Sequence, residues 1–250
     1  MKVVIICYYN VIMKLIIAGV GPGTPGLITL EALNEARRSD LILVPSLGAG
    51  KNRRGIAEKI ILAHVPEARV VRVNFPMIQD SDRRNGIILL QLNNIKADLK
   101  TSQQIFFPVI GDSLLFSTGA YLAEAFRKIF PDVTVNIIPG ISVHSLAASY
   151  AQKFLAMSDE ILSIVPGNAS PEKIYDIMRT SNAIAIYKPN LLKNLRELVE
   201  ATGPYEKIFR VDHAGIPGKE RVIDGLQALK RLKEYMSIII LWKDSQERSK

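Results

Sequence analysis

The chain has 250 residues, of which 48% are hydrophobic and 22% are charged, and these values are ordinary for a globular protein that buries a sizeable core. Its 32 Lys and Arg residues outnumber its 24 acidic residues, which gives a net charge of +8 and favours an anionic partner such as nucleic acid, a membrane surface or a polycarboxylate. A single cysteine, Cys7, excludes an internal disulfide framework and a cysteine-based metal cluster, and it is typical of a cytoplasmic protein.

Residues 1–12 contain an apolar run that is too short to span a bilayer. A secretory signal is the alternative interpretation, but no small-residue cleavage site follows. A second Met-Lys pair, Met13-Lys14, opens a strand that leads directly into a glycine-rich motif. We therefore interpret residues 1–12 as an extension outside the core.

Short β-branched runs alternate with helical patterns through the first half of the chain, which predicts a parallel sheet covered by helices. Thr29 is expected to cap a helix that places Leu30, Leu33 and Ala36 on one face, and a second helix is expected over 119–128. The predicted strands lie at 14–20, 41–46, 68–75, 104–112 and 133–140.

A second set of such runs predicts another α/β unit, so the expected fold is two tandem α/β domains. These strands lie at 161–167, 182–190, 206–215 and 235–243. We place the domains at 13–140 and 141–243, with a bridging helix over 141–154 that follows the Pro139-Gly140 turn.

The turn Gly19-Val20-Gly21-Pro22-Gly23 follows the first strand and precedes a helix, where glycines let the backbone approach a ligand closely. Two familiar interpretations are the dinucleotide fingerprint and the glycine loop of doubly wound methyltransferases. Both require an acidic residue after the next strand, which instead ends in Val44-Pro45-Ser46. Pro22 and Pro25 also remove backbone donors that a phosphate site would use, so both interpretations are disfavoured.

Polar residues stand at the ends of three predicted strands. Asp112 would lie at the carboxyl edge of the parallel sheet, where open α/β folds bind ligands, although it could instead cap the next helix. Ser142, after the next strand, could cap its helix or donate to a bound group. We therefore expect a crevice between Asp112 and Ser142. Met77 and Asp80 follow a third strand, and an ordinary turn is the competing interpretation there.

The three histidines, His64, His144 and His213, are too far apart in sequence for metal-ligand spacing, so no metal is predicted. A lone histidine is most often structural, but His144 and His213 are by position the best candidates for a catalytic acid or base. The densest basic patch comprises Lys51, Arg53 and Arg54. It is interpreted either as a solvated face or as a rim that attracts an anionic substrate.

Five segments, in this order and spacing, resemble the motifs of the tetrapyrrole (corrin/porphyrin) methylase family: AGVGPGTPGLITLEAL, FPMIQD, VIGDSLLFSTGAYL, VNIIPGISVHSLAAS and ILSIVPG. The resemblance covers about residues 13–242. Within the family, the FPM-x-x-D turn and the Gly-Asp loop that continues into Phe116-Ser117-Thr118 are similar to the branch that methylates C20 of precorrin-2 or cobalt-factor II. The resemblance therefore implies S-adenosylmethionine-dependent C20-methylation in cobalamin biosynthesis.

The resemblance also implies the two-domain class III methyltransferase fold, a homodimer, and S-adenosylmethionine in the interdomain cleft. Carried over by position, the cofactor-binding residues would be Asp112, Leu115, Ser117, Thr118, Ile141, Ser142, Tyr187, Asp212, His213 and Ala214. The residues facing the tetrapyrrole would be Gly21, Pro22, Gly23, Thr24, Pro25, Met77 and Asp80.

Two residues depart from the family pattern: Thr24 stands where Asp is usual, and Ser113 stands where Pro is usual. The alternatives are another branch of the family, such as a diphthine synthase or an RNA ribose methylase, and a non-enzymatic RNA-binding module. The FPM-x-x-D turn disfavours the other branches. An aromatic content of 7% and the lack of an RNP-type motif disfavour the module. Since the substrate's carboxylates would account for the basic charge, neither a nucleic-acid partner nor a membrane partner is expected.

Overall fold

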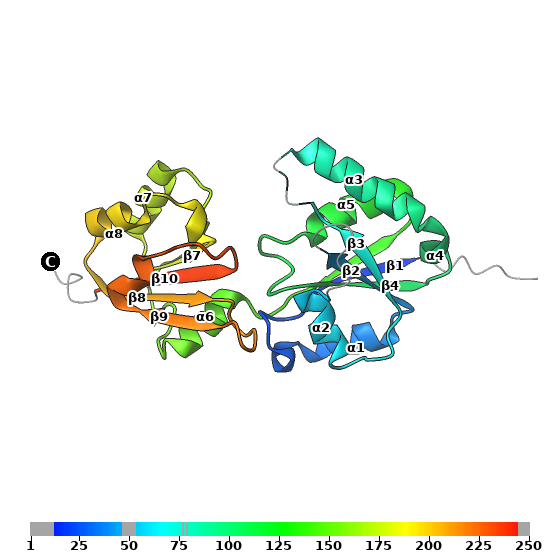
Figure 1. Cartoon of the computed structure of the whole chain (residues 1–250), viewed down its shortest axis with the longest axis horizontal. Coiled ribbons are helices and arrows are strands. Elements are labelled where there is room, and N and C mark those ends of the chain that lie inside the picture. The colour runs from blue at the N-terminus through cyan, green and yellow to red at the C-terminus, as the bar shows by residue number, and fades with distance from the viewer. Residues whose placement is uncertain (1–12, 47–53, 77, 79, 245–250) are drawn as a thin grey trace, which may run out of the picture. The chain divides into compact units, whose positions relative to one another are not determined.

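The computed structural model describes residues 13–46, 54–76, 78 and 80–244. These residues divide into two compact units (Figure 1). The first unit extends to Gly21 and resumes over Pro25–Gly140, and the second combines Pro22–Thr24 with the residues from Ile141 onward. None of the described helices combines the length and the hydropathy needed to cross a membrane.

A five-stranded parallel sheet forms the centre of the first unit, in the strand order β3-β2-β4-β1-β5. The strands are β1 (Lys14–Gly19), β2 (Leu41–Ser46), β3 (Val70–Asn74), β4 (Gln104–Val109) and β5 (Thr134–Ile138). The three inner strands are almost continuously apolar because helices cover both faces of a parallel sheet. All five predicted strands and their parallel arrangement are confirmed.

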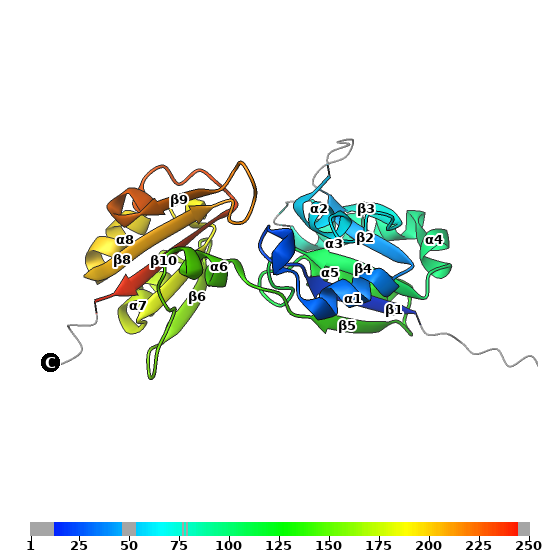
Figure 2. The ribbon, with the colours of Figure 1, turned by 90° about the horizontal axis from the view of Figure 1, so that it is seen from below.

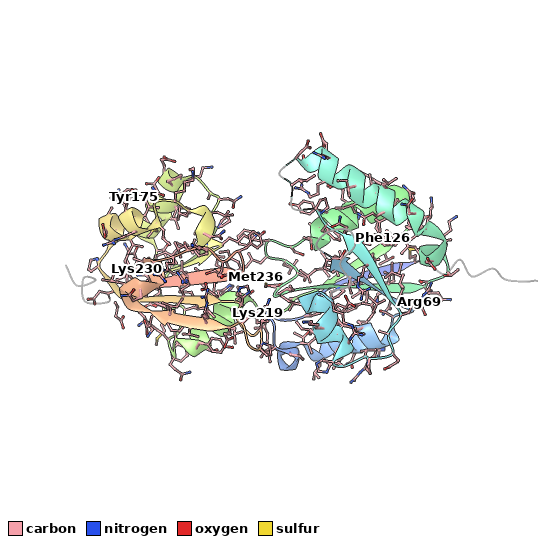
Figure 3. All side chains as sticks on the ribbon, viewed as in Figure 1. Arg69, Phe126, Tyr175, Lys219, Lys230 and Met236 are labelled. Carbon is pink, nitrogen blue, oxygen red and sulfur yellow. The ribbon has the colours of Figure 1, made fainter. Side chains whose placement is uncertain are left out.

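Alternate residues of each strand serve two separate cores, one on each face of this sheet. Leu15 and Ile17 of β1 pack with α3 (Ser81–Asn94), α4 (Lys96–Lys100) and α5 (Gly119–Ile129). Ile16 and Ala18 pack with α1 (Leu30–Arg38) and α2 (Ile56–Leu62) on the other face. Phe126, labelled in Figure 3, is a fully buried side chain that α5 contributes. The two-residue period of a strand thus builds both layers.

The predicted cap of α1 is confirmed, because Thr29 Oγ1 accepts a hydrogen bond from the Ala32 amide at 3.2 Å. The buried face of α1 consists of Ala32, Leu33 and Ala36. The placement of Leu30 on that face is wrong, since its side chain is 78% exposed. At 100° per residue, Leu30 lies about 120° around the helix from Ala36 and points away from the sheet. The helix predicted over 119–128 is confirmed as α5.

The second unit contains a mixed sheet in the order β6-β7-β10-β8-β9. Its strands are β6 (Leu162–Pro166), β7 (Ala183–Tyr187), β8 (Tyr205–Asp212), β9 (Arg221–Asp224) and β10 (Ser237–Lys243). Only β6 and β7 pair in parallel, and the other neighbours are antiparallel. Four of these strands were predicted. The fifth, β9, is a short strand that was not predicted and that pairs with β8 at the edge of the sheet.

Helices cover both faces of the second sheet as well. Residues of α7 (Pro171–Thr180) and α8 (Leu195–Thr202) join the apolar core on one face. Helix α6 (Val143–Tyr150), within the predicted 141–154 helix, contacts β8 and β10, and Figure 2 shows it apart from α7 and α8. Both units are therefore α/β layers, as predicted.

Candidate active site

Three glycines bring together the carboxyl ends of β1, β4 and β5, and we call Gly19, Gly111 and Gly140 the three-glycine junction. A Cβ atom on Gly19 would lie 2.6 Å from the Gly111 carbonyl oxygen, and one on Gly140 would lie 2.3 Å from the same oxygen. Gly111 also exchanges backbone hydrogen bonds with Gly21, of 2.8 and 3.3 Å. The three strand ends can meet this closely only because no side chain separates them.

Asp112 follows this junction and organises the loop 112–118. Its Oδ1 accepts hydrogen bonds from the amides of Leu114, at 3.0 Å, and Gly140, at 3.3 Å. The alternative that Asp112 caps the next helix is wrong, because α5 begins only at Gly119. The carboxylate instead ties its own loop to the end of β5, and its Oδ2 accepts no hydrogen bond from the described residues.

Hydroxyl groups fix the rest of loop 112–118. The buried Ser113 hydroxyl donates to the Ile138 carbonyl at 2.6 Å. Ser117 Oγ accepts from the Gly119 amide at 2.9 Å, whereas Thr118 occupies the N-cap position of α5 without a side-chain bond. Leu115, Ser117 and Thr118 are half-buried. Where the family usually has a rigid proline, Ser113 thus supplies a hydrogen bond to β5.

Two hollows adjoin the first sheet. The larger, of about 380 Å³, is lined by Lys14, Glu35 and Asn136 among others, and Lys14 begins β1, at the opposite end from the three-glycine junction. The smaller, of about 280 Å³, is lined by residues of loop 112–118 together with parts of β1, β5 and α5. Size therefore does not identify the site, and the hollow beside loop 112–118 is the one next to the predicted residues.

In the second unit the structure brings together two predicted site residues, His144 and Tyr187. His144 Nδ1 lies 2.8 Å from the Tyr187 hydroxyl, and the two rings meet edge to face with centroids 6.1 Å apart. Ser142 occupies the N-cap position of α6 but makes no side-chain cap hydrogen bond. His144 in the first turn of α6 and Tyr187 at the end of β7 therefore form a pair that the sequence did not predict.

The side chains of Asp212 and His213, in the turn 212–214, each have charged neighbours. Asp212 is 1% exposed, and its two oxygens lie 3.2 Å from Arg210 Nε and 3.2 Å from Arg221 Nη2. His213, at a left-handed φ of 52°, places Nε2 3.0 Å from Glu234 Oε2. The hydrogen bond from His213 holds the pKa of the Glu234 carboxyl below its usual value. Only backbone groups of Asp212 remain for a ligand, and His213 already has an acidic partner.

The Gly-Pro-Gly-Thr turn lies against this segment of the second unit. Thr24 Oγ1 donates to the Gly215 carbonyl at 3.3 Å, and a Cβ atom on Gly23 would lie 2.7 Å from the Ala214 carbonyl oxygen. An ionised aspartate, which the family usually has at this position, could not donate that hydrogen bond. Pro25 lies elsewhere, in the first unit, where its carbonyl is 2.9 Å from His64 Nε2.

Other predicted residues have structural partners or lie outside the described residues. Asp80 caps α3, because its carboxylate accepts from the Arg83 amide at 3.0 Å. Arg54 is exposed. Met77, Lys51, Arg53 and residues 1–12 lie outside the described residues. Within the described ranges, no group of three His, Cys, Asp or Glu side chains could hold a metal ion.

Comparison with known protein families identifies the family to which this chain belongs. The family of tetrapyrrole (corrin/porphyrin) methylases matches residues 14–229. The chain belongs to this family. It is a methyltransferase, and the family resemblance read from the sequence is confirmed.

Two relatives of this tetrapyrrole methylase match almost end to end. The "Probable cobalt-precorrin-2 C(20)-methyltransferase" of Methanocaldococcus jannaschii is 32% identical over 234 residues, covering 93% of this chain and 97% of that protein. The "Precorrin-2 C(20)-methyltransferase" of a Sinorhizobium species is 24% identical over 245 residues, covering 92% and 96%.

A solved structure shows the same fold. The uroporphyrin-III C-methyltransferase of Thermus thermophilus, complexed with S-adenosylhomocysteine, superposes with a TM-score of 0.64 at 18% identity, covering 92% of this chain and 97% of that one. The predicted tetrapyrrole methylase fold is therefore confirmed.

Proposed function

We propose that this tetrapyrrole methylase transfers a methyl group from S-adenosylmethionine to C20 of cobalt-factor II or precorrin-2 in cobalamin biosynthesis. The observation that carries the proposal is the match, over almost the whole of both chains, to relatives named for C20-methylation. The 32% relative is named for the cobalt-containing substrate and the 24% relative for the metal-free one, which favours the cobalt form.

We propose that S-adenosylmethionine binds at the carboxyl edge of the first sheet, beside loop 112–118. Ligands of open α/β sheets bind outside the carboxyl ends of the strands, and the close packing of the three-glycine junction holds three of these strand ends together beside loop 112–118. Asp112 fits a role toward ribose hydroxyls or the sulfonium, because one oxygen is held by the loop and the other is free of hydrogen bonds to described residues. Leu115, Ser117 and Thr118 are the remaining proposed contacts in this loop.

The second unit's proposed cofactor contacts are Ile141, Ser142, Tyr187, Asp212, His213 and Ala214. Because the Asp212 carboxylate and the His213 imidazole already have ionic partners, we propose backbone contacts at those two positions. The tetrapyrrole-facing residues remain proposed as Gly21 to Pro25 with Met77 and Asp80. Of these, Asp80 keeps one carboxylate oxygen engaged as a helix cap.

When bound, S-adenosylmethionine supplies the methyl group. The nucleophile is the substrate's own electron-rich C20, so the protein's main task is to hold the reactants in line. After the new carbon–carbon bond forms, a base must remove the proton from C20. We propose His144 as that base, with Tyr187 orienting its ring through the Nδ1 contact of 2.8 Å. His213 is the weaker candidate because Glu234 already pairs with it.

The net charge of +8 suits a substrate that carries several carboxylates. We also propose that the protein acts as a cytoplasmic homodimer without nucleic-acid or membrane partners. Incubation with total cellular RNA should therefore transfer no label from S-adenosylmethionine, whereas an RNA methylase of the same family would label its target RNA.

The decisive experiment supplies labelled S-adenosylmethionine together with either cobalt-factor II or precorrin-2. We expect the mass of one methyl group to appear at C20 of one of these substrates, and the preferred substrate identifies the metal state. Methylation at another ring position, or of neither substrate while S-adenosylmethionine is bound, would overturn the proposal.

A further inference from the structure

Arg84 of α3 is held in a fixed orientation by two neighbours in the first unit. Its guanidinium carbon lies 4.1 Å from the centroid of the Tyr121 ring on α5. Its Nη1 donates to the Ile78 carbonyl at 3.2 Å. The ring sets the plane of the guanidinium and the carbonyl holds one of its edges, so only a small rotation within that plane is left to the group.

The opposite edge of this guanidinium has no acceptor among the residues that the structure describes. Nε is buried and, like Nη2, donates a hydrogen bond to none of them. Arg72, also in the first unit, shows how such an edge is normally used: its Nε and Nη2 bind the two oxygens of Glu58, with the Nε distance at 3.0 Å. Buried donors are almost always paired, so the unpaired Nε of Arg84 indicates that an acceptor is missing from this edge. The comparison with Arg72 indicates that a carboxylate would fit there.

The position of Arg84 agrees with a ligand on this side of the sheet. Ile78 belongs to the turn that links the carboxyl end of β3 to α3. Since the strands are parallel, this turn and loop 112–118 follow strands that end at the same edge of the first sheet. A group bound by Arg84 would therefore lie along the edge where we propose that the reaction takes place.

We propose that Arg84, supported by Tyr121, binds one acidic side chain of the tetrapyrrole and thereby sets the orientation of the ring. This inference rests on the proposed function. The carboxylate binds first at Nη2, and a small rotation of the guanidinium brings its second oxygen to Nε. A bidentate contact of this kind fixes the direction of the bound carboxylate as well as neutralising its charge. A lysine at the same position would neutralise the charge without fixing the direction.

The test compares Arg84→Gln with Arg83→Gln, which removes the same charge from the neighbouring, exposed residue of α3. Binding of cobalt-factor II and of S-adenosylmethionine is measured separately. We expect Arg84→Gln to raise the Kd for cobalt-factor II by about tenfold or more, as for the loss of a hydrogen bond between charged groups. Arg83→Gln should raise it less than about twofold, and neither change should alter the Kd for S-adenosylmethionine.

Further variants distinguish a direct contact between Arg84 and a substrate carboxylate from an effect on folding and from non-specific electrostatic attraction. Arg84→Lys keeps the charge and should still weaken binding, while Tyr121→Phe should be neutral and Tyr121→Leu harmful, because only the ring supports the guanidinium. For esterified cobalt-factor II, which has no free carboxylates, wild type and Arg84→Gln should have the same Kd. Equal effects of Arg83→Gln and Arg84→Gln, or wild-type binding by Arg84→Lys, would overturn this inference. Failure of the wild-type protein to bind cobalt-factor II would instead overturn the proposed function.

Discussion

His144 and Tyr187, which are 43 residues apart in the sequence, form a side-chain contact of 2.8 Å between Nδ1 and the hydroxyl oxygen. The contact joins the first turn of α6 to the carboxyl end of β7. It gives the imidazole a defined orientation, which a catalytic base requires and which an isolated surface histidine lacks.

The first prediction follows from this pair. His144→Gln should remove the acid limb of the pH profile of kcat, because a histidine base must be neutral to accept the C20 proton, and it should lower kcat at least about a hundredfold. Tyr187→Phe should lower kcat by about tenfold and change the Kd for S-adenosylmethionine less. Tyr175→Phe removes a phenol from α7 and serves as the control. An unchanged acid limb in His144→Gln would exclude His144 as the base.

Asp112 is expected to contribute both structure and charge. Asp112→Ala should weaken S-adenosylmethionine binding at least about tenfold, since a hydrogen bond to a charged group contributes about 1.5 to 3 kcal/mol. Asp112→Asn keeps an oxygen that can accept from the Leu114 and Gly140 amides. If calorimetry shows that the Asn variant binds like wild type while the Ala variant does not, the carboxylate only ties the loop. Wild-type affinity in both variants would contradict the assignment of Asp112 to the site.

The three-glycine junction should not tolerate a methyl group. In Gly140→Ala the new Cβ would lie 2.3 Å from the Gly111 carbonyl oxygen, so the strand ends must separate. We expect loss of S-adenosylmethionine binding and a lower Tm. Gly86→Ala on α3 is the matched control, because a Cβ there meets nothing within 4 Å and alanine stabilises a helix interior by about 0.5 to 1 kcal/mol. A Gly140→Ala protein with wild-type Tm would show that the junction is not close-packed.

Tyr205 should make the protein less stable at high pH. Burial raises the pKa of the Tyr205 phenol, and the hydrogen bond with Thr202 at 2.7 Å opposes that rise only in part. Because the unfolded phenol ionises near pH 10 while the folded one stays protonated, its stabilising contribution is complete below about pH 10 and is lost above it. Tm measured from pH 9 to 11 should fall more steeply for wild type than for Tyr205→Phe. Parallel curves would contradict this.

The excess of Lys and Arg over acidic residues should mainly affect binding of the tetrapyrrole. Raising the salt concentration should increase the KM for the tetrapyrrole and leave the Kd for S-adenosylmethionine nearly constant, because exposed charges are screened beyond about 8 Å at physiological ionic strength. Changing both Arg53 and Arg54 to Ala should flatten this salt dependence if they form the attracting rim. A wild-type salt slope in the double variant would make them ordinary surface residues.

Periodicity and turn residues were enough to predict nine of the ten strands in the described part of the chain, because each of the nine contains a run of apolar or β-branched residues. The tenth, β9, has the sequence RVID with mostly exposed side chains, so it lacks the apolar signal and depends on pairing with β8. Leu30 was wrongly predicted to lie on the buried face of α1, because an apolar residue at the start of a helix need not face the core.

The family motifs propose the residues of the candidate site, Asp112 and Tyr187 among them, but they do not predict the contacts of these residues. The ion pairs of Asp212 with Arg210 and Arg221, for example, depend on how β8 and β9 pair. The three-glycine junction likewise forms between strands that are distant in sequence. Spacing along the chain cannot reveal such contacts, because they arise only when the sheet is assembled.

Pro22–Thr24 pack with the second unit although they lie between segments of the first, so the polypeptide passes between the units at Gly21-Pro22, Thr24-Pro25 and Gly140-Ile141. A single cut after Gly140 would consequently not yield two self-sufficient halves. A fragment starting at Ile141 would lack the Thr24 hydroxyl that donates to Gly215 and the Gly23 backbone beside Ala214. Any chimaera that exchanges the second unit with a relative must therefore exchange this short N-terminal turn as well.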